Sequence, residues 1–156
     1  MVQRMITGLI LFGLTACNQQ SPAQPIRDLM VKRVQPTAQV YWDAVQYVSD
    51  ENGQHNIVPR NDAEWERTRK AAADLAELGQ LLKTSTYTEG RGEDWSQFAQ
   101  GLIAISDQAQ KAARTKNTGA VFEAGASIYN VCAACHQVYL PKPTATSKAP
   151  TVGEER

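Results

Sequence analysis

The sequence is poor in the residues that most often bind metals or change redox state. Its 156 residues include two histidines, three cysteines and three methionines. A zinc site needs about four ligands at suitable spacing, but no second cysteine pair accompanies Cys132 and Cys135. Basic and acidic residues number 16 each, so the formal net charge is zero. The basic face of a nucleic-acid-binding protein is therefore not expected, and nucleic acid is excluded as a partner.

Alternating apolar and polar residues, the pattern of a half-buried β-strand, do not extend over any useful length. Apolar residues instead recur at spacings of three and four, which predicts amphipathic helices. The chain is long enough for one ordinary domain. Similar helix lengths and short connections predict an all-α fold, an antiparallel up-down-up-down four-helix bundle. The predicted helices span about residues 26–48, 62–83, 95–116 and 119–140.

Local signals mark where these helices begin and bend. Asn61 is a good N-cap for the second helix, and Glu64 follows three residues later as a capping box requires. Asp94 is the corresponding cap predicted for the third helix. Pro36 lies inside the first helix and is expected to kink it or to limit its first turns, because proline lacks a backbone N–H.

The first 17 residues form an export signal. Arg4 supplies a positive charge, and residues 6–14 form an apolar run too short to span a bilayer. The closing residues Leu14-Thr15-Ala16-Cys17 resemble the bacterial lipobox. That resemblance implies a lipoprotein whose acylated Cys17 anchors it to a membrane from the periplasmic side, and Asn18 implies the outer membrane. An ordinary cleaved signal with an incidental cysteine is the alternative.

Two polar segments flank the helical region. Residues 18–25 contain glutamine, serine and two prolines, and we predict a flexible tether between the lipid and the domain. Residues 141–156 lack a bulky apolar cluster, which predicts a disordered tail. The folded domain is therefore predicted over residues 26–140.

The sequence Cys132-Ala133-Ala134-Cys135-His136 has the spacing of a c-type haem attachment site. Two thiols add to the two vinyl groups of haem, and the adjacent imidazole of His136 reaches the iron as proximal ligand. On a helix, residues three and four apart lie on one face. A redox disulfide is the main competing interpretation, but it normally lies at a helix N-terminus after a strand. Export strengthens the haem interpretation, because bacteria attach haem c outside the cytoplasmic membrane.

The second axial ligand has two candidates. Met1 and Met5 are removed with the predicted signal, so Met30 is the one methionine that remains. His55 is the one histidine besides His136. In the predicted bundle, the start of the first helix lies beside the end of the fourth, which brings Met30 close to His136. His55 lies at the opposite end and is rejected. Three roles of Met30 remain open: distal iron ligand, a residue that lines the pocket without binding iron, and an ordinary core residue.

The chain resembles the cytochrome c-prime group and its low-spin, Met-ligated relatives, over about residues 26–140. Cys132, Cys135 and His136 match the attachment residues, Tyr139 matches a common aromatic, and Met30 falls near the origin of the distal residue. The resemblance implies one covalent haem, periplasmic redox partner proteins and a tendency to form homodimers. The chain departs from that group at Leu140, where a basic residue is frequent.

The function predicted from these observations is electron transfer by an exported monohaem cytochrome that is not an enzyme. A five-coordinate haem that binds nitric oxide or carbon monoxide, as a sensor or scavenger, is the alternative. A haem-free helical interaction lipoprotein is the second alternative.

Overall fold

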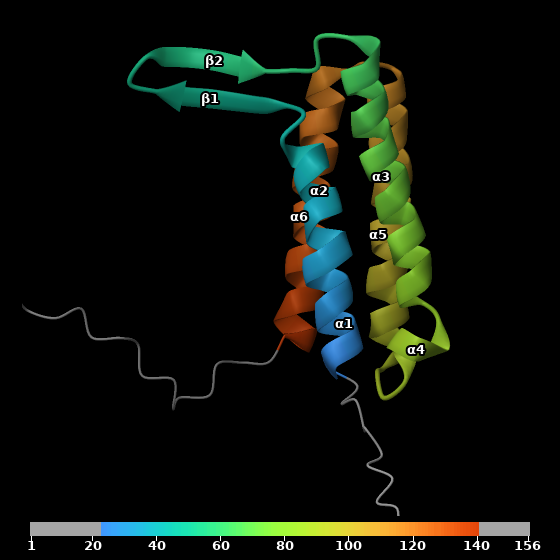
Figure 1. The fold of residues 1–156 in the computed structure, drawn as a ribbon. Helices are drawn as coiled ribbons and strands as arrows, with labels where there is room; N and C mark the ends of the chain where they lie inside the picture. Colours follow the sequence, from blue (N-terminus) through green and yellow to red (C-terminus); the bar gives the residue numbers. More distant parts are fainter. Residues whose placement is uncertain (1–22, 141–156) are drawn as a thin grey trace, which may run out of the picture.

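A computed structural model of the chain describes residues 23–140. The predicted export signal with Cys17, the tail at 141–156 and most of the tether lie outside the described residues. The last part of the predicted tether is helical, because α1 begins at Ala23. The fold is mostly helical with one small two-stranded sheet (Figure 1).

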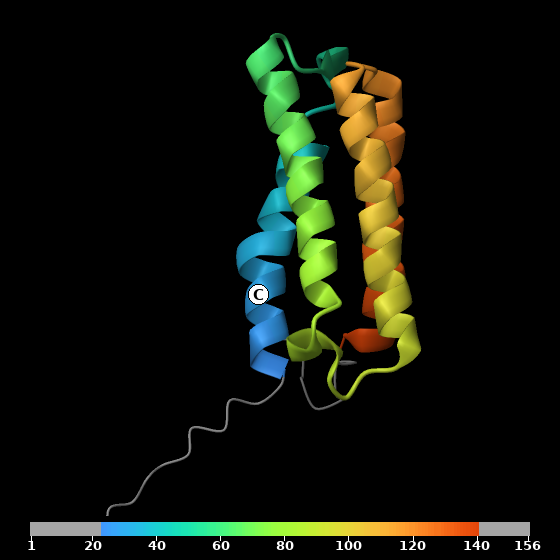
Figure 2. The same ribbon diagram turned by 90° about the vertical axis from the view of Figure 1, so that its right-hand side faces the viewer.

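Three long helices and an N-terminal helical segment lie side by side, as Figures 1 and 2 show. None of the helices between residues 23 and 140 is both long and apolar enough to cross a membrane. The prediction of a mainly helical protein is confirmed, with boundaries close to those expected for the last three helices. The helices are α1 (Ala23–Leu29), η1 (Met30–Val34), α2 (Gln35–Trp42), α3 (Asp62–Leu82), α4 (Ser85–Thr88), α5 (Glu93–Arg114) and α6 (Thr118–Tyr139).

The N-terminal segment is interrupted where the proline predicts it. Met30 to Val34 form a π-helical turn, in which the N–H of Gln35 donates to the carbonyl of Met30. Pro36 follows at the start of α2. A proline ring clashes with the carbonyl four residues earlier and supplies no N–H, so a wider turn before it relieves both problems.

A β-hairpin replaces the last part of the predicted first helix, and the prediction of helix to residue 48 is wrong there. Helix α2 ends at Trp42, and β1 (Gln46–Asp50) pairs antiparallel with β2 (Gly53–Ile57). The turn uses Gly53 at φ 108°, a region that side chains rarely adopt. The hairpin escaped prediction because its strands are mostly polar and exposed, so they carry no alternating pattern.

The core is built on close packing of α3 against α5 and of α5 against α6. Leu75 of α3 and Ile128 of α6 are fully buried. Small residues let α3 and α5 approach closely: a Cβ added to Gly79 would meet Ile103 Cγ1 at 2.7 Å. The start of α3 is capped as predicted, because Asn61 Oδ1 accepts from the N–H of Glu64 at 2.9 Å.

We expect Gly79→Ala to destabilise the protein by up to about 2 kcal/mol, because overpacking a filled interface costs about 1–3 kcal/mol and the better helix propensity of alanine offsets about 1 kcal/mol of this. The matched control is Gly101→Ala, whose added Cβ would lie 3.7 Å from Val131. That variant should gain about 0.5–1 kcal/mol. Urea unfolding measures both values, and a Gly79→Ala protein at least as stable as the original would contradict the packing described.

Candidate functional site

The predicted attachment residues lie in the last turns of α6, at the end of the helical body where α1 begins (Figure 1). Cys132 and Cys135 are half-buried free thiols, and His136 is exposed. Their spacing of three and four residues places them on neighbouring positions of one helix face. No strand precedes the pair, since it lies deep in α6.

Both thiols and His136 line a small apolar cavity of about 80 Å³ with Met30. The structure thus brings together the four residues that the sequence singled out. It does not bring His55, which lies in β2 of the hairpin at the opposite end of the body (Figure 1). The rest of the lining comes from η1 and α2 (Val34, Gln35, Ala38, Trp42), α3 (Leu82), α5 (Trp95, Phe98, Ala99, Leu102) and α6 (Val131).

The π-turn helps to place Met30 in this lining. Met30, Val34, Ala38 and Trp42 all line the cavity at intervals of four residues. In a regular α-helix, four residues overshoot one full turn by about 40°, so such a series drifts around the helix. The wider turn at η1 reduces this drift. Pro36 follows this wider turn and favours it. The proline therefore influences which side chains of the N-terminal segment line the cavity together with Met30.

The cavity lies where α6 meets the N-terminal segment (α1, η1 and α2), a sparsely packed boundary that we call the seam. Helix α6 packs along α5 over much of its length but makes few close approaches to α2. Trp42 spans the seam, with its indole N–H donating to the carbonyl of Gly125 at 2.9 Å. A Cβ on Gly125 would lie 3.2 Å from the Trp42 ring, so glycine admits this contact. Sequence patterns do not predict this role of Trp42, because the contact joins residues far apart in the chain.

An aromatic cluster fixes the last turn of α6. The Tyr139 hydroxyl donates to Asp94 Oδ1 at 2.5 Å, and its ring meets the Trp95 ring edge-on at 4.9 Å. The Trp95 indole N–H donates to the carbonyl of Leu82 at 2.8 Å. The prediction that Asp94 is the N-cap of α5 is wrong: Gly92 is the N-cap, and the Asp94 carboxylate accepts from both the N–H of Trp95 and the hydroxyl of Tyr139. The hydrogen bond to Asp94 raises the pKa of Tyr139.

The surroundings of the two thiols raise their pKa values. Burial raises the pKa of Cys132, and burial together with Cys132 and Asp94 raises the pKa of Cys135 to about 11. Reactive thiols of disulfide oxidoreductases have lowered pKa values and lie at helix N-termini. The observed position near a helix C-terminus has the opposite effect, because the helix dipole there disfavours a negative charge.

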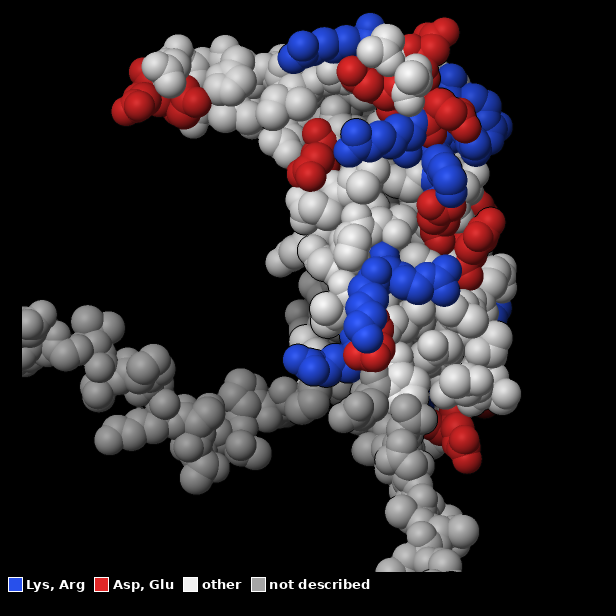
Figure 3. Space-filling model, in the orientation of Figure 1, with Lys and Arg blue, Asp and Glu red and all other residues white. Residues whose placement is uncertain are grey.

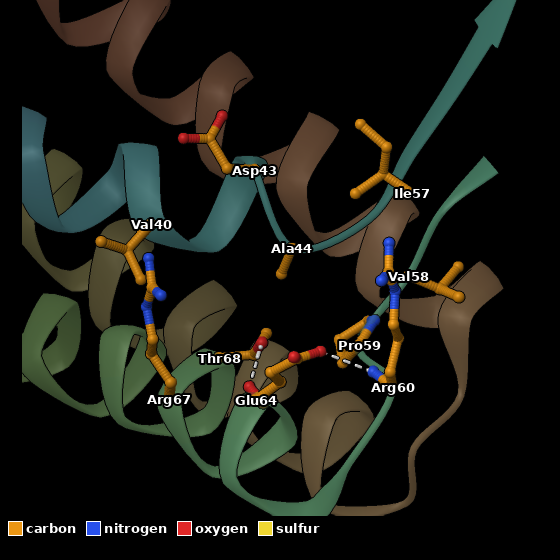
Figure 4. A pocket seen from close by; sticks show the side chains of 10 residues that line it. All are labelled: Val40, Asp43, Ala44, Ile57, Val58, Pro59, Arg60, Glu64, Arg67 and Thr68. Atoms are coloured by element: carbon orange, nitrogen blue, oxygen red, sulfur yellow. Dashed lines mark hydrogen bonds between the residues drawn. The ribbon is translucent and has the colours of Figure 1, made fainter. Parts of the chain in front are cut away.

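A larger cavity of about 210 Å³ lies at the other end of the body, beneath the hairpin (Figure 4). Polar groups of its lining form hydrogen bonds at the start of α3. Glu64 Oε2 accepts from the N–H of Arg60 at 2.6 Å, and the Thr68 hydroxyl donates to the carbonyl of Glu64 at 2.9 Å. The lining includes none of the predicted site residues.

Comparisons of the chain with protein-family models, with curated proteins and with solved structures find no match. Functional inference therefore depends on the cavity at the end of α6.

We expect the Cys135 thiol of the haem-free, reduced protein to react slowly with iodoacetamide at neutral pH. A pKa of about 11 instead of the usual 9.0 lowers the reactive thiolate fraction about a hundredfold. The rate should keep rising above pH 9 in a Cys17→Ser, Cys132→Ser background that isolates Cys135, because burial and Asp94 still raise its pKa when the contribution of Cys132 is removed. A rate that levels off below pH 8 would contradict this and favour a redox dithiol.

Proposed function

We propose that this protein is an exported monohaem c-type cytochrome that transfers electrons. The observation that carries the proposal is the shared cavity: Cys132, Cys135 and His136 line it from α6, and Met30 lines it from η1. Cys132 and Cys135 would bond the haem, and His136 would be the proximal iron ligand. The bound haem would supply one-electron exchange at its iron.

The proposal includes the finer architecture. With α1, η1 and α2 counted as one interrupted helix, we propose that it forms an antiparallel up-down-up-down bundle with α3, α5 and α6. The side-by-side arrangement in Figures 1 and 2 supports this topology. It also explains why Met30 and His136, which are distant in sequence, line one cavity.

The residues around the cavity fit a haem in chemistry. The lining is mostly apolar, and three sulfur-containing side chains and one imidazole are its characteristic functional groups. In its present form the cavity holds about 80 Å³, whereas sites for ligands of drug size measure about 300–1,000 Å³. Binding therefore requires the seam between α6 and the N-terminal segment to widen. The few close contacts across that seam keep the cost of widening low.

Met30 decides between the two haem functions. If its sulfur binds iron opposite His136, both axial positions are filled and electron exchange is favoured. If Met30 only lines the cavity, its apolar surroundings suit nitric oxide or carbon monoxide. We favour ligation because Met30 lines the same cavity as the attachment residues but from a different segment, η1 instead of α6.

The proposal also includes the cellular location. Attachment of haem c takes place outside the cytoplasmic membrane, which agrees with the predicted export signal. We propose that Cys17 carries the lipid and that the domain is held at the periplasmic face of a membrane, most simply the outer membrane. Its partners would be periplasmic redox proteins.

We expect protein matured in a haem-attaching periplasm to keep its haem under denaturing conditions, because thioether bonds survive unfolding. Cys132→Ala combined with Cys135→Ala should abolish haem staining on a denaturing gel. His55→Ala should leave both the stain and the absorption spectrum unchanged, since His55 lies at the opposite end. Absence of stain in the unsubstituted protein would refute the proposed function and leave the haem-free interaction lipoprotein.

We expect the ferric protein to be low-spin with a weak far-red sulfur-to-iron band, and the reduced protein to bind carbon monoxide slowly. Met30→Ala should convert it to a high-spin form that binds carbon monoxide rapidly and completely, because the sixth position opens. Absorption spectra with and without carbon monoxide measure both properties. A high-spin spectrum that Met30→Ala does not alter would exclude ligation by Met30 and favour the gas-binding alternative.

A further inference from the structure

The end of the body that carries the candidate haem site is also the end nearest the proposed lipid anchor. Ala23, where α1 begins, is only six positions after Cys17. Even a fully extended chain of that length spans at most about 22 Å. Helix α6 rises about 33 Å from its end to its start. A lipid on Cys17 therefore holds the end with Met30 and His136 near the bilayer, and the hairpin lies at the far end (Figure 1).

One edge of this end combines exposed apolar and basic side chains. Val31 of η1 is 60% exposed, and Val138 and Leu140 at the end of α6 are each 56% exposed. Exposed Arg27 and Arg33 lie on the neighbouring α1 and η1. Figure 3 shows positive side chains over the lower part of the N-terminal segment.

The remaining charged residues at this end distinguish the edge formed by α1, η1 and the end of α6 from the side around the start of α5. On the N-terminal segment, Lys32 is paired with Asp28 at 2.7 Å. Helix α6 carries one acidic residue, Glu123, near its opposite end. Apart from Asp28, the acidic residues of this end lie around the start of α5: Glu89, Glu93 and Asp94, of which Asp94 accepts a hydrogen bond from Tyr139 of α6.

We propose that the edge formed by α1, η1 and the end of α6 lies against an anionic lipid surface, with the acidic side around the start of α5 turned away. Apolar side chains at a membrane surface insert between headgroups, and basic residues beside them attract anionic lipid. This inference rests on the proposed function, specifically on the lipid at Cys17. It implies that the cavity with His136 opens close to the membrane, where a membrane-bound redox partner would reach it.

The test uses the full lipidated, haem-loaded protein in vesicles. Cys17 is then acylated and the other two thiols hold haem, so an introduced cysteine is the reactive one. Val138→Cys reports on the proposed contact, and Gln54→Cys in the hairpin is the control. In vesicles of phosphatidylcholine with phosphatidylglycerol, we expect a membrane-impermeant maleimide to label position 138 at least tenfold more slowly than in detergent. Labelling at position 54 should change less than twofold.

Charge-neutralising pairs test the chemistry of the contact. Each basic residue near an anionic surface contributes about fivefold to binding, so Arg27→Gln with Arg33→Gln should remove most of the protection. Arg60→Gln with Arg67→Gln, at the opposite end, should preserve it. Circular dichroism checks that each variant is folded.

The outcomes separate this inference from the proposed function. Intact mass reports haem and lipid independently of labelling. Haem and lipid present with no protection at position 138 would overturn the inference and leave the cytochrome proposal standing. Protection that persists in detergent and rises with protein concentration would overturn it in favour of a second copy of the chain. Absence of haem would refute the proposed function itself.

Discussion

The way in which α6 is held governs the rest of this structure. Along its length α6 packs against α5, and at its end Tyr139 donates to Asp94 while its ring meets Trp95. Trp95 in turn donates to the carbonyl of Leu82, which ties the ends of α3 and α6 to α5. These contacts fix the backbone that carries Cys132 to His136. Cys132, Cys135 and His136 therefore lie on the firmly packed side of the cavity.

The N-terminal segment is the adaptable side. Pro36 prevents a continuous α-helix, and the π-turn before it places Met30 in line with the other cavity residues. π-Turns inside helices are frequently found at functional sites, because they are retained only where their local cost is offset. Few close approaches join this segment to α6, and Trp42 provides the main hydrogen bond. A seam of this kind can widen for a ligand without disturbing the packing of α3 on α5.

Sequence patterns predicted the regular parts of the fold well and the irregular parts poorly. The bounds of α3, α5 and α6 follow from apolar spacing, and Asn61 with Glu64 marks the start of α3. The sequence does not predict the hairpin, because its mostly polar, exposed strands follow no burial pattern. Asp94 was misassigned because a cap and a long-range hydrogen bond use the same carboxylate, and local sequence cannot distinguish them.

The sequence by itself determined the functional groups and their local geometry. Two thiols and an imidazole at spacings of three and four share one helix face wherever the helix lies, since helix geometry is local. It also determined that Met30 and His136 would lie at one end, through the order of the helices. Only the tertiary structure decided that Met30 lines the same cavity, that Trp42 bonds to Gly125 and Tyr139 to Asp94, and that burial raises the pKa of both thiols. Those features depend on contacts between residues far apart in the chain, and on the wider turn before Pro36, which no periodic pattern encodes.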